Sequence, residues 1–361
     1  MNRVGIVGTG LIGGSVGLAL RAHGVAVTGY DAEPDRARAA RKVGAIDETV
    51  DSVAELGDLD LVVVAVPVGL SADIVIAALD AGVPVVTDVG SVKAPVVARV
   101  REARPELAAR FVGGHPMAGS EQDGLEGADA ELFVGATWVL TPTAETDAGA
   151  FAAVRDLVAQ LGAEPLAVPP EHHDELVALV SHVPQLAAST LMDVAATAGE
   201  EHATLLRLAA GGFRDMTRVA AGHPAIWPDI CVANRSAIVE ALDGYLDALN
   251  QVRTLVADGD RSGLLDLLQR ARAARRNLPV GAPAGEALVE LRIPVTDRPG
   301  VIAEVTTLAG RLGVNIRDLE IAHSAEGAHG VLVLVVSEPQ VEAFEHALDE
   351  QGFHHTRTAL P

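Results

Sequence analysis

The sequence predicts an α/β protein with three successive folds: a doubly wound parallel sheet, an all-helical domain, and a small βαββαβ domain. Apolar strand-like runs alternate with helical segments over the first third of the chain, and strand signals then stop. Mixed signals return only after a stretch rich in Pro, Gly and Ala. We therefore predict domains at 1–170, 171–278 and 287–361, with a linker at 279–286.

The strands of the first domain are short runs of Val, Ile and Leu. Such runs, without polar alternation, are typical of strands that are buried on both faces of a parallel sheet. The four strongest runs lie at 3–8, 25–30, 59–67 and 83–89, and shorter strands are predicted at 110–113, 136–141 and 164–168.

The second domain is predicted to be helical, with interruptions at Pro184, Gly211-Gly212, 222–224 and Gly259. Its longest helix is expected at 224–258, where apolar residues recur at spacings of three and four. At about 1.5 Å per residue such a helix is roughly 50 Å long. That length exceeds what one small domain buries, so we expect it to pack against a second subunit in a homodimer.

The third domain alternates strand and helix in the order βαββαβ, which is the ferredoxin-like arrangement. The predicted elements are a strand at 287–295, a helix at 299–312, strands at 314–323 and 329–336, a helix at 339–351 and a strand at 352–358.

Composition restricts the function classes. The chain has 27 basic and 49 acidic residues, a net charge of −22, which repels nucleic acid and anionic membranes. Any anionic substrate must therefore be held by local Arg residues. The single cysteine, Cys231, allows no internal disulfide and fits a reducing compartment. Neither a signal peptide nor an apolar run of about 18 residues is present, so a cytoplasmic location is expected.

A nucleotide site is indicated by "GTGLIGGS", which follows the first strand and opens a helix. Gly8 allows the tight turn, Gly10 lets the backbone approach a pyrophosphate, and Gly13 lets helix and strand pack closely. This is the Rossmann dinucleotide pattern. Asp31, at the end of the second strand, would bond both ribose hydroxyls and repel a 2′-phosphate, which favours NAD over NADP. A glycine-rich turn without a ligand is the alternative.

Further residues are expected at the cofactor because they belong to this motif or to a loop beside it. They are Leu11 and Ile12 within the glycine motif, and Val66 and Pro67 at the end of the third strand.

Candidate catalytic residues follow neighbouring strands. "DVGSVK" places Ser91 after one strand, and "GGHPMAGSE" places His115 on a Gly-rich turn after the next, with Glu121 beyond it. The carboxyl ends of parallel strands meet at one edge, so these side chains should converge on the nicotinamide. A neutral imidazole there can accept the proton of an alcohol as hydride leaves the same carbon. His115 could equally cap its turn.

The helical domain would hold the substrate. "GGFRDMTRVA" sets Arg214 and Arg218 one turn apart, a spacing suited to binding carboxylates. A solvated helix face is the alternative for this pair. His182 in "VSHVPQ" could be a hydrogen-bonded core histidine, and His172-His173 is not a convincing metal site because adjacent helical side chains diverge.

A resemblance narrows these alternatives. "GLIGGS", "DVGSVK", "GGHPMAGSE", "SHVPQ" and "GGFRDMTR…AIWPDICVANR" occur in this order along nearly the whole chain, which resembles the prephenate dehydrogenase family of tyrosine biosynthesis. The resemblance implies that His115 is the catalytic group and that Ser91 hydrogen-bonds at the same centre. It also implies that Arg218 anchors a substrate carboxylate, that His182 contacts substrate, and that Glu121 guards the pocket entry.

Two positions depart from the family pattern. Arg214 occupies a position that is often Lys in relatives. Gln185 stands where many relatives have a second histidine, as in SHLPH. The loss of that donor leaves open whether the keto acid prephenate or the amino acid arogenate is the preferred substrate.

The tail resembles an ACT regulatory domain through "DRPGVIAEVTTLAGRLGVNI". That resemblance implies an aromatic amino-acid effector, most simply tyrosine. The expected effector residues are Asp297 and Gly300 in the first loop, and Asn315 and Ile316 at the start of the next strand. A module that only strengthens the dimer is the alternative.

The implied reaction is oxidation of a cyclohexadienol with loss of CO₂, and it requires NAD⁺ and a base but no metal. Three alternatives are weighed against it. Arogenate dehydrogenase differs only in substrate. A β-hydroxyacid dehydrogenase would place a catalytic Lys in the second domain, whereas the only lysines are Lys42 and Lys93. A non-enzymatic sensor of NAD and amino acids would have no use for Ser91, His115 and Arg218 around one crevice.

Overall fold

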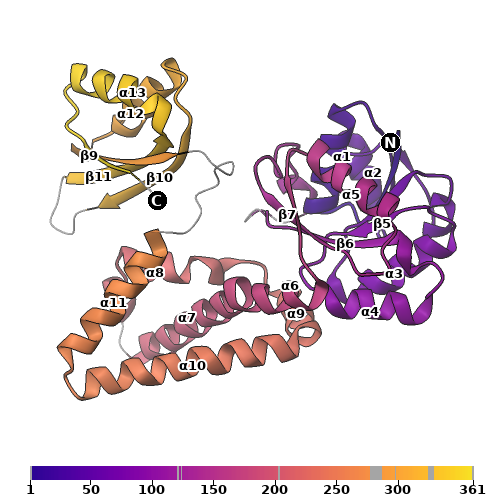
Figure 1. Cartoon of the computed structure of the whole chain (residues 1–361), viewed down its shortest axis with the longest axis horizontal. Helices are drawn as coiled ribbons and strands as arrows, with labels where there is room; N and C mark the ends of the chain where they lie inside the picture. Colours follow the sequence, from indigo (N-terminus) through magenta and orange to yellow (C-terminus); the bar gives the residue numbers. More distant parts are fainter. Residues whose placement is uncertain are drawn as a thin grey trace. The chain divides into compact units, whose positions relative to one another are not determined.

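The computed structural model describes residues 2–119, 122, 124–201, 204–276, 287–296, 298–323 and 329–359. The chain divides into two compact units, Met1–Leu249 and Asn250–Pro361. Figure 1 labels the elements of both units, and each unit is described by itself.

The first unit contains an eight-stranded sheet with the order β3-β2-β1-β4-β5-β6-β7-β8. All neighbouring strands are parallel except β6 and β7, which are antiparallel. The strands are β1 Arg3–Val7, β2 Ala26–Tyr30, β3 Glu48–Thr49, β4 Leu61–Val64, β5 Val86–Asp88, β6 Phe111–Pro116, β7 Thr137–Thr141 and β8 Glu164–Ala167. The strand order reverses between β1 and β4, where doubly wound sheets bind ligands.

The seven strands predicted for this domain are all present, and the doubly wound class is confirmed. The sequence gives no signal for β3, which has only two residues. The antiparallel direction of β7 was also not anticipated, because a short apolar run carries no information about strand direction.

Helices cover both faces of this sheet: α1, α2 and α5 lie on one side, and α3 and α4 on the other (Figure 1). Along β4, Leu61 and Val63 pack toward the first layer, and Val62 and Val64 toward the second. This alternation explains why the strand is apolar at every position. The helices are α1 Leu11–Ala22, α2 Pro34–Lys42, α3 Val68–Asp80, α4 Ala94–Ala103 and α5 Ala148–Gln160.

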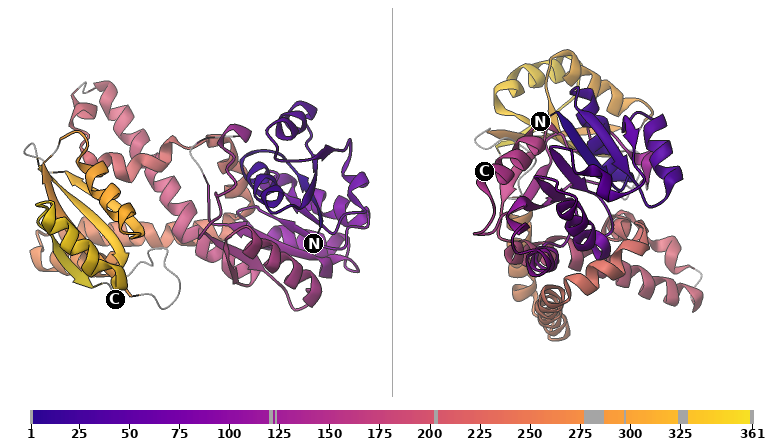
Figure 2. Two further views of the ribbon diagram at one scale, coloured as in Figure 1. Left: turned by 90° about the horizontal axis from the view of Figure 1, so that it is seen from above. Right: turned by 90° about the vertical axis from the view of Figure 1, so that its right-hand side faces the viewer.

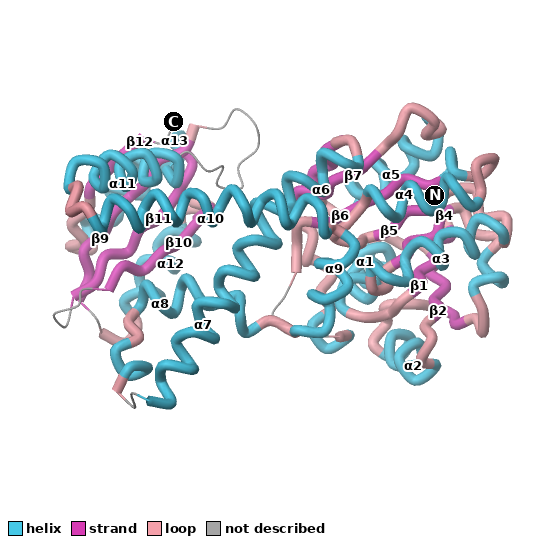
Figure 3. The backbone as a smooth tube through the Cα atoms, turned by 90° about the horizontal axis from the view of Figure 1, so that it is seen from below, coloured by secondary structure: helices cyan, strands magenta, loops and turns pink. Residues whose placement is uncertain are grey.

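The rest of the first unit is helical (Figure 3). Its main segments are α6 Pro170–Val177, the π-helical turn η4 Ala178–His182, α7 Val183–Glu201, α8 Gly211–Thr217, the 3₁₀ turns η6 Arg218–Ala221 and η7 Pro224–Ile226, α9 Trp227–Ala233 and α10 Arg235–Ala257. Among the described residues, no helix is long and apolar enough to cross a membrane.

Two helix predictions were wrong. The stretch 224–258 is not one helix, because Asn234 interrupts it with φ −105° and ψ 29°. The side chain of Asn234 bonds to Asp174 and His182, and these tertiary contacts hold the break open. Pro184 does not interrupt the chain of helices either. It lies at the start of α7, directly after the π-helical turn, where a proline costs few backbone hydrogen bonds.

The second unit contains the end of α10, then α11 and a four-stranded antiparallel sheet with the order β10-β11-β9-β12. Helices α12 and α13 pack on this sheet through one apolar core (Figure 2). The six elements predicted for the tail are all present, in the predicted order. They are β9 Leu288–Thr296, α12 Val301–Arg311, β10 Ile316–His323, β11 His329–Ser337, α13 Glu338–Glu350 and β12 Thr356–Ala359, preceded by α11 Arg261–Arg276.

Candidate active site

The glycine turn between β1 and α1 has the shape that a pyrophosphate requires. Gly8 has φ +92°, and a Cβ there would lie 2.3 Å from the Ala65 carbonyl oxygen. A Cβ at Gly13 would lie 1.9 Å from the Gly8 oxygen, so α1 can pack against β1 only without one. A Cβ at Gly10, by contrast, would meet nothing within 4 Å. The turn is therefore closed toward the protein and open at the helix N-terminus, where backbone N–H groups attract phosphate.

Asp31 lies directly after β2 and beside this turn. Its Oδ2 accepts hydrogen bonds from the Thr9 N–H at 2.8 Å and the Thr9 hydroxyl at 3.0 Å, and its Oδ1 accepts from the Glu33 N–H at 2.9 Å. Asp31 also lines a cavity of about 130 Å³, together with Tyr30 and Arg38. The carboxylate is thus fixed where a ribose would follow the pyrophosphate.

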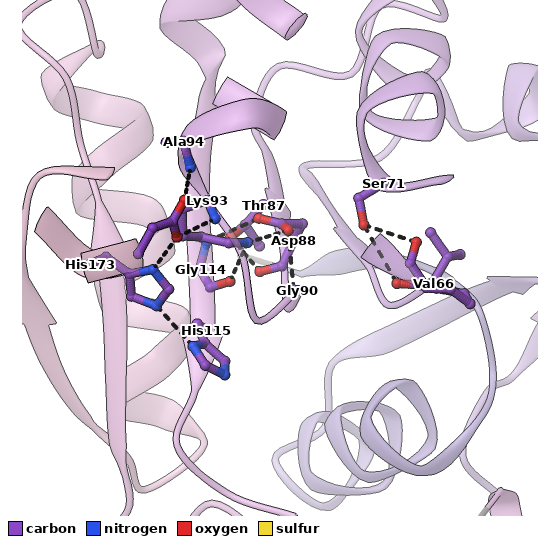
Figure 4. Close-up of polar contacts among 12 residues, drawn as sticks. Val66, Ser71, Thr87, Asp88, Gly90, Lys93, Ala94, Gly114, His115 and His173 are labelled. Atoms are coloured by element: carbon purple, nitrogen blue, oxygen red, sulfur yellow. Dashed lines mark hydrogen bonds and ion pairs between the residues drawn. The ribbon is translucent and has the colours of Figure 1, made fainter. Parts of the chain in front are cut away.

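The other predicted cofactor residues surround the same turn. Leu11 and Ile12 form the first residues of α1 and are half-buried. A Cβ at Gly8 would lie 3.1 Å from Val66, and the carbonyls of Val66 and Pro67 accept bonds from the buried Ser71 hydroxyl at 3.5 and 3.4 Å. Ser71 therefore fixes the loop after β4 (Figure 4).

Strand β6 carries the motif that contains His115. Its two glycines are required by close neighbours: a Cβ at Gly113 would lie 2.4 Å from the Thr141 hydroxyl, and one at Gly114 would lie 2.7 Å from the Asp88 carbonyl. His115 itself pairs with Val139 of β7 and belongs to the strand. The predicted Gly-rich turn at this position was therefore wrong. The pairing of β6 with β7 therefore holds the backbone of His115 in an extended conformation.

A buried ion pair supports this strand from behind. Lys93 is fully buried, and its ammonium group bonds to Asp88 and, at 2.8 Å, to the Gly114 carbonyl. Asp88 in turn accepts the N–H groups of Gly114 and Gly90, both at 3.1 Å. Burial lowers the pKa of Lys93, and Asp88 opposes that shift. Because every polar atom of the pair is bonded, this cluster fixes the backbone on which His115 stands.

A chain of side chains leads away from His115 (Figure 4). His115 Nδ1 lies 2.9 Å from His173 Nε2, and His173 Nδ1 lies 2.8 Å from Asp174 Oδ1. Asp174 also accepts the N–H groups of Lys93 and Ala94, both at 2.8 Å, and so caps α4. Figure 4 shows the second ring nitrogen of His115 pointing away from His173.

The surroundings of His115 favour its neutral form. Burial lowers its pKa well below 6.5, and His173, Lys93 and His182 lower it further. Asp88 and Asp174 are the acidic groups of this cluster, and each is bonded to a partner of its own. A neutral imidazole at pH 7 can accept a proton, as a general base must.

His182 lies in the π-helical turn and is buried, with its ring edge-on to Trp227 at 6.2 Å. The Asn234 amide nitrogen donates to the Asp174 carbonyl at 2.8 Å and lies 3.3 Å from His182 Nδ1. Since that nitrogen is a donor, His182 Nδ1 accepts and His182 Nε2 carries the hydrogen. Nε2 has no partner among the described residues, so a donor is left for a ligand. Burial also lowers the pKa of His182, against the effect of Asp174.

Three further residues were predicted at the site: Ser91, Gln185 and Glu121. Ser91 is half-buried in the loop after β5 and makes no hydrogen bond to another described residue. Gln185 donates to Ser189 at 3.3 Å within α7. Glu121 lies outside the described residues.

Arg214 and Arg218 do not share one helix as predicted. Arg214 is in α8, whereas Arg218 begins η6, and both are exposed. The elements that carry them, α8 and η6, both pack on α7. The pair therefore does not lie on one regular helix face.

Three residues of the cluster were not anticipated as functional: His173, Asp174 and Asn234. A metal was the only role considered for His173, and its bond to His115 spans 58 positions of sequence. The pattern "HHD" at the start of a helix that follows a strand was the available signal.

Two family models match the chain. The nucleotide-binding domain of prephenate dehydrogenase matches residues 16–167, beginning just after the glycine motif, and the dimerization domain of prephenate dehydrogenase matches residues 169–270. A prephenate dehydrogenase of Bacillus subtilis is 33% identical over 91% of this chain and 90% of its own length.

Solved structures agree in fold. The prephenate dehydrogenase of A. aeolicus, solved in complex with hydroxyphenyl propionate and NAD⁺, has a TM-score of 0.72 and 32% identity over 77% of this chain and 99% of its own. The arogenate dehydrogenase of Synechocystis has a TM-score of 0.66 and 31% identity over 76% of this chain and 98% of its own. The chain belongs to the prephenate dehydrogenase family.

Proposed function

We propose that this protein catalyses the NAD⁺-dependent oxidative decarboxylation of prephenate to 4-hydroxyphenylpyruvate, a step of tyrosine biosynthesis. The observation that carries the proposal is the position of His115 on β6, in the sheet that also bears the glycine turn, where burial lowers the pKa of its imidazole. An acceptor at the carboxyl edge of such a sheet suits removal of a hydroxyl proton beside a nicotinamide.

Each residue of the site has its own role in the proposed reaction. Bound NAD⁺ would accept the hydride from C4 of the cyclohexadienol. His115 accepts the hydroxyl proton as the carbonyl forms, and Ser91 bonds the same oxygen. The ring carboxylate then leaves as CO₂, and its bonding electrons aromatise the ring. Rigid alignment by the Lys93–Asp88 cluster lowers the entropic cost of this geometry.

Substrate binding is assigned to donors outside β6. His182 Nε2, which has no partner among the described residues, would donate to a substrate oxygen. Arg218 binds a carboxylate, Arg214 contributes charge beside it, Gln185 lies one turn from His182, and Glu121 guards the entry. Arg214 in α8 and Arg218 at the start of η6 would reach the substrate from separate elements of the helical segment.

The choice of substrate depends on the side-chain end of the molecule, where prephenate has a keto group and arogenate an amino group. Relatives act on either, since one neighbour is named prephenate dehydrogenase and another arogenate dehydrogenase. Arogenate oxidation is the alternative function. Steady-state rates with prephenate and arogenate, each with NAD⁺ and NADP⁺, test the proposal. We expect the highest kcat/KM with prephenate and NAD⁺, and NADH formation from neither substrate would refute it.

Cofactor choice is tested at Asp31. Asp31→Ala removes the ribose acceptor and the repulsion of a 2′-phosphate, and leaves Arg38 in the same cavity to attract that phosphate. We expect a higher KM for NAD⁺ and a smaller preference for NAD⁺ over NADP⁺, measured as the ratio of kcat/KM values. Glu33→Ala, whose exposed side chain pairs with Arg36, is the control. An unchanged ratio would place the ribose elsewhere.

A homodimer formed through α10 is proposed from its exposed apolar face. Val239, Leu246 and Leu249 are 50%, 53% and 45% exposed on a helix of 23 residues. Burying such side chains yields roughly 1.5–3 kcal/mol each. Light scattering at micromolar concentration should give a dimer, which Leu246→Asp shifts toward monomer while Glu240→Gln does not. A monomeric wild type would contradict this.

Feedback by an aromatic amino acid, most simply tyrosine, is proposed for the ferredoxin-like, ACT-like tail. A cavity of about 690 Å³ there is lined by Gly300 and Arg298, among others. Gly300 has φ +93° and opens α12, where N–H groups attract a carboxylate. Asn315 and Ile316, also predicted as effector residues, do not line this cavity, and Asp297 lies outside the described residues.

Deletion of 287–361 tests this regulation. Coupling between two sites is typically about 1–3 kcal/mol, so tyrosine should weaken prephenate binding by roughly 5- to 150-fold in the full chain and much less in the truncated one. Solved relatives are covered almost completely by about three quarters of this chain, which favours folding of the truncated form. Equal inhibition of both forms would assign tyrosine to the active site.

A further inference from the structure

The chain of hydrogen bonds from His115 through His173 ends at Asp174, whose carboxylate can only accept hydrogen bonds. Asp174 Oδ1 accepts the Lys93 N–H, and Oδ2 accepts the Ala94 N–H, each at 2.8 Å. A carboxylate bonded in this way has no proton to offer. The His173 Nδ1 at 2.8 Å from Oδ1 must therefore be the donor in that contact.

The donor in the contact between His173 and Asp174 also determines the donor in the contact between His173 and His115. A neutral imidazole carries one hydrogen, so His173 with its hydrogen on Nδ1 presents a lone pair at Nε2. His115 Nδ1, 2.9 Å away, must then donate. The hydrogen of His115 is thereby placed on Nδ1, and its Nε2, which points away from His173, keeps the lone pair (Figure 4).

We infer that His173 and Asp174 are positioning residues that hold His115 in the tautomer whose free nitrogen can accept the substrate proton. This inference rests on the proposed role of His115 as base. In hydrolytic triads a buried carboxylate holds the base histidine in one tautomer directly. Here a second imidazole stands between them.

The same residue sets the opposite tautomer on His182. The main-chain carbonyl of Asp174 accepts from Asn234, and the amide nitrogen of Asn234 faces His182 Nδ1. Asp174 thus gives His115 a free acceptor and His182 a free N–H. Asp174 lies in α6, and its carboxylate caps the start of α4, which links these histidines to the loop that carries Lys93.

The alternative to this role is packing. His173 is 2% exposed, and its ring meets His115 edge-on at 5.1 Å between centroids. A residue that only filled space would be replaced by Leu at little cost in rate, and would not discriminate between Leu and Gln. A hydrogen-bonding role predicts that Gln, whose amide oxygen can accept from His115 Nδ1, rescues what Leu loses.

The test compares His173→Leu and His173→Gln in the full-length enzyme, with His172→Leu as matched control. His172 is the preceding residue, and its ring is 57% exposed and pairs with Glu175. A triad whose histidine is forced into the wrong tautomer loses about 10⁴-fold in kcat, and we expect a loss of roughly 10²-fold or more for His173→Leu. His173→Gln should stay within about tenfold of wild type, because one hydrogen bond of this kind contributes about 1 kcal/mol. The Kd of NAD⁺ should not change in either variant, nor should the kcat of His172→Leu.

The tautomer itself is measured by NMR of ¹⁵N-labelled histidine in the wild-type enzyme, with the His115 signals assigned by their loss in His115→Asn. The inference predicts a protonated Nδ1 and an unprotonated Nε2. The opposite pattern would overturn it, even if His173→Leu fails to fold. It would also be overturned if a folded His173→Leu kept kcat within about threefold of wild type, or if Gln were as impaired as Leu. Full activity in His115→Asn, by contrast, would refute the proposed base and not the measured tautomer.

Discussion

Replacing His115 with Asn is expected to lower kcat by roughly 10²- to 10⁴-fold, the range for loss of a general base. Asn can keep a hydrogen bond to His173 but cannot accept a proton from the substrate hydroxyl. The Kd of NAD⁺ should be nearly unchanged, because the glycine turn follows β1 and Asp31 follows β2, whereas His115 lies on β6. The loss should therefore appear in the chemical step.

Single-turnover rates with saturating prephenate and NAD⁺ measure this effect, and fluorescence titration measures NAD⁺ binding. His23→Asn is a suitable control, since His23 directly follows α1 and its side chain bonds only to the Ala19 carbonyl among the described residues. A His115→Asn enzyme that retained most of its kcat would remove His115 from the chemistry.

Replacing Arg218 with Ala is expected to raise the KM for prephenate. Hydrogen bonds to charged groups contribute about 1.5–3 kcal/mol, which corresponds to an increase of roughly 10- to 150-fold. The substrate carries two carboxylates and the protein a net charge of −22, so the global field offers no compensation. We expect kcat to change less than KM.

The matched control is Arg207→Ala, another exposed arginine of the helical segment. Equal KM values in wild type and Arg218→Ala would show that Arg218 is a solvated charge. Equal effects of Arg207→Ala and Arg218→Ala would instead reveal a general electrostatic contribution of this face.

The sequence was sufficient to predict seven of the eight strands of the sheet, because buried parallel strands leave unbroken apolar runs such as "LVVV" in β4. It was also sufficient for the glycine turn, where Gly8 and Gly13 are required by close neighbours and Gly10 leaves open space at the helix N-terminus. The break at Asn234 was not predictable from local pattern, since two tertiary hydrogen bonds maintain it.

Sequence motifs indicated individual residues of the candidate site, but they did not predict the hydrogen bonds between those residues. His115 is recognisable from its motif, yet its contact with His173 depends on how α6 packs beside β6. The periodicity rule for adjacent side chains correctly separated His172 from His173, but separation from a neighbour says nothing about partners elsewhere. Arg218 shows the reverse case: its motif identifies it, while the local pattern does not reveal that it begins a 3₁₀ turn after α8.

The central claim is that a neutral, half-buried His115 is the base, and the pH dependence of kcat/KM tests it most directly. The pKa of His115 is lowered below 6.5, so the base stays unprotonated at pH 6.5 and is lost only as pH falls through that lower pKa. The account predicts an acid limb of kcat/KM for prephenate with its midpoint below pH 6.5 in the wild type, and no such limb in the residual activity of His115→Asn. A midpoint above pH 6.5, or a limb that persists unchanged in His115→Asn, would contradict it.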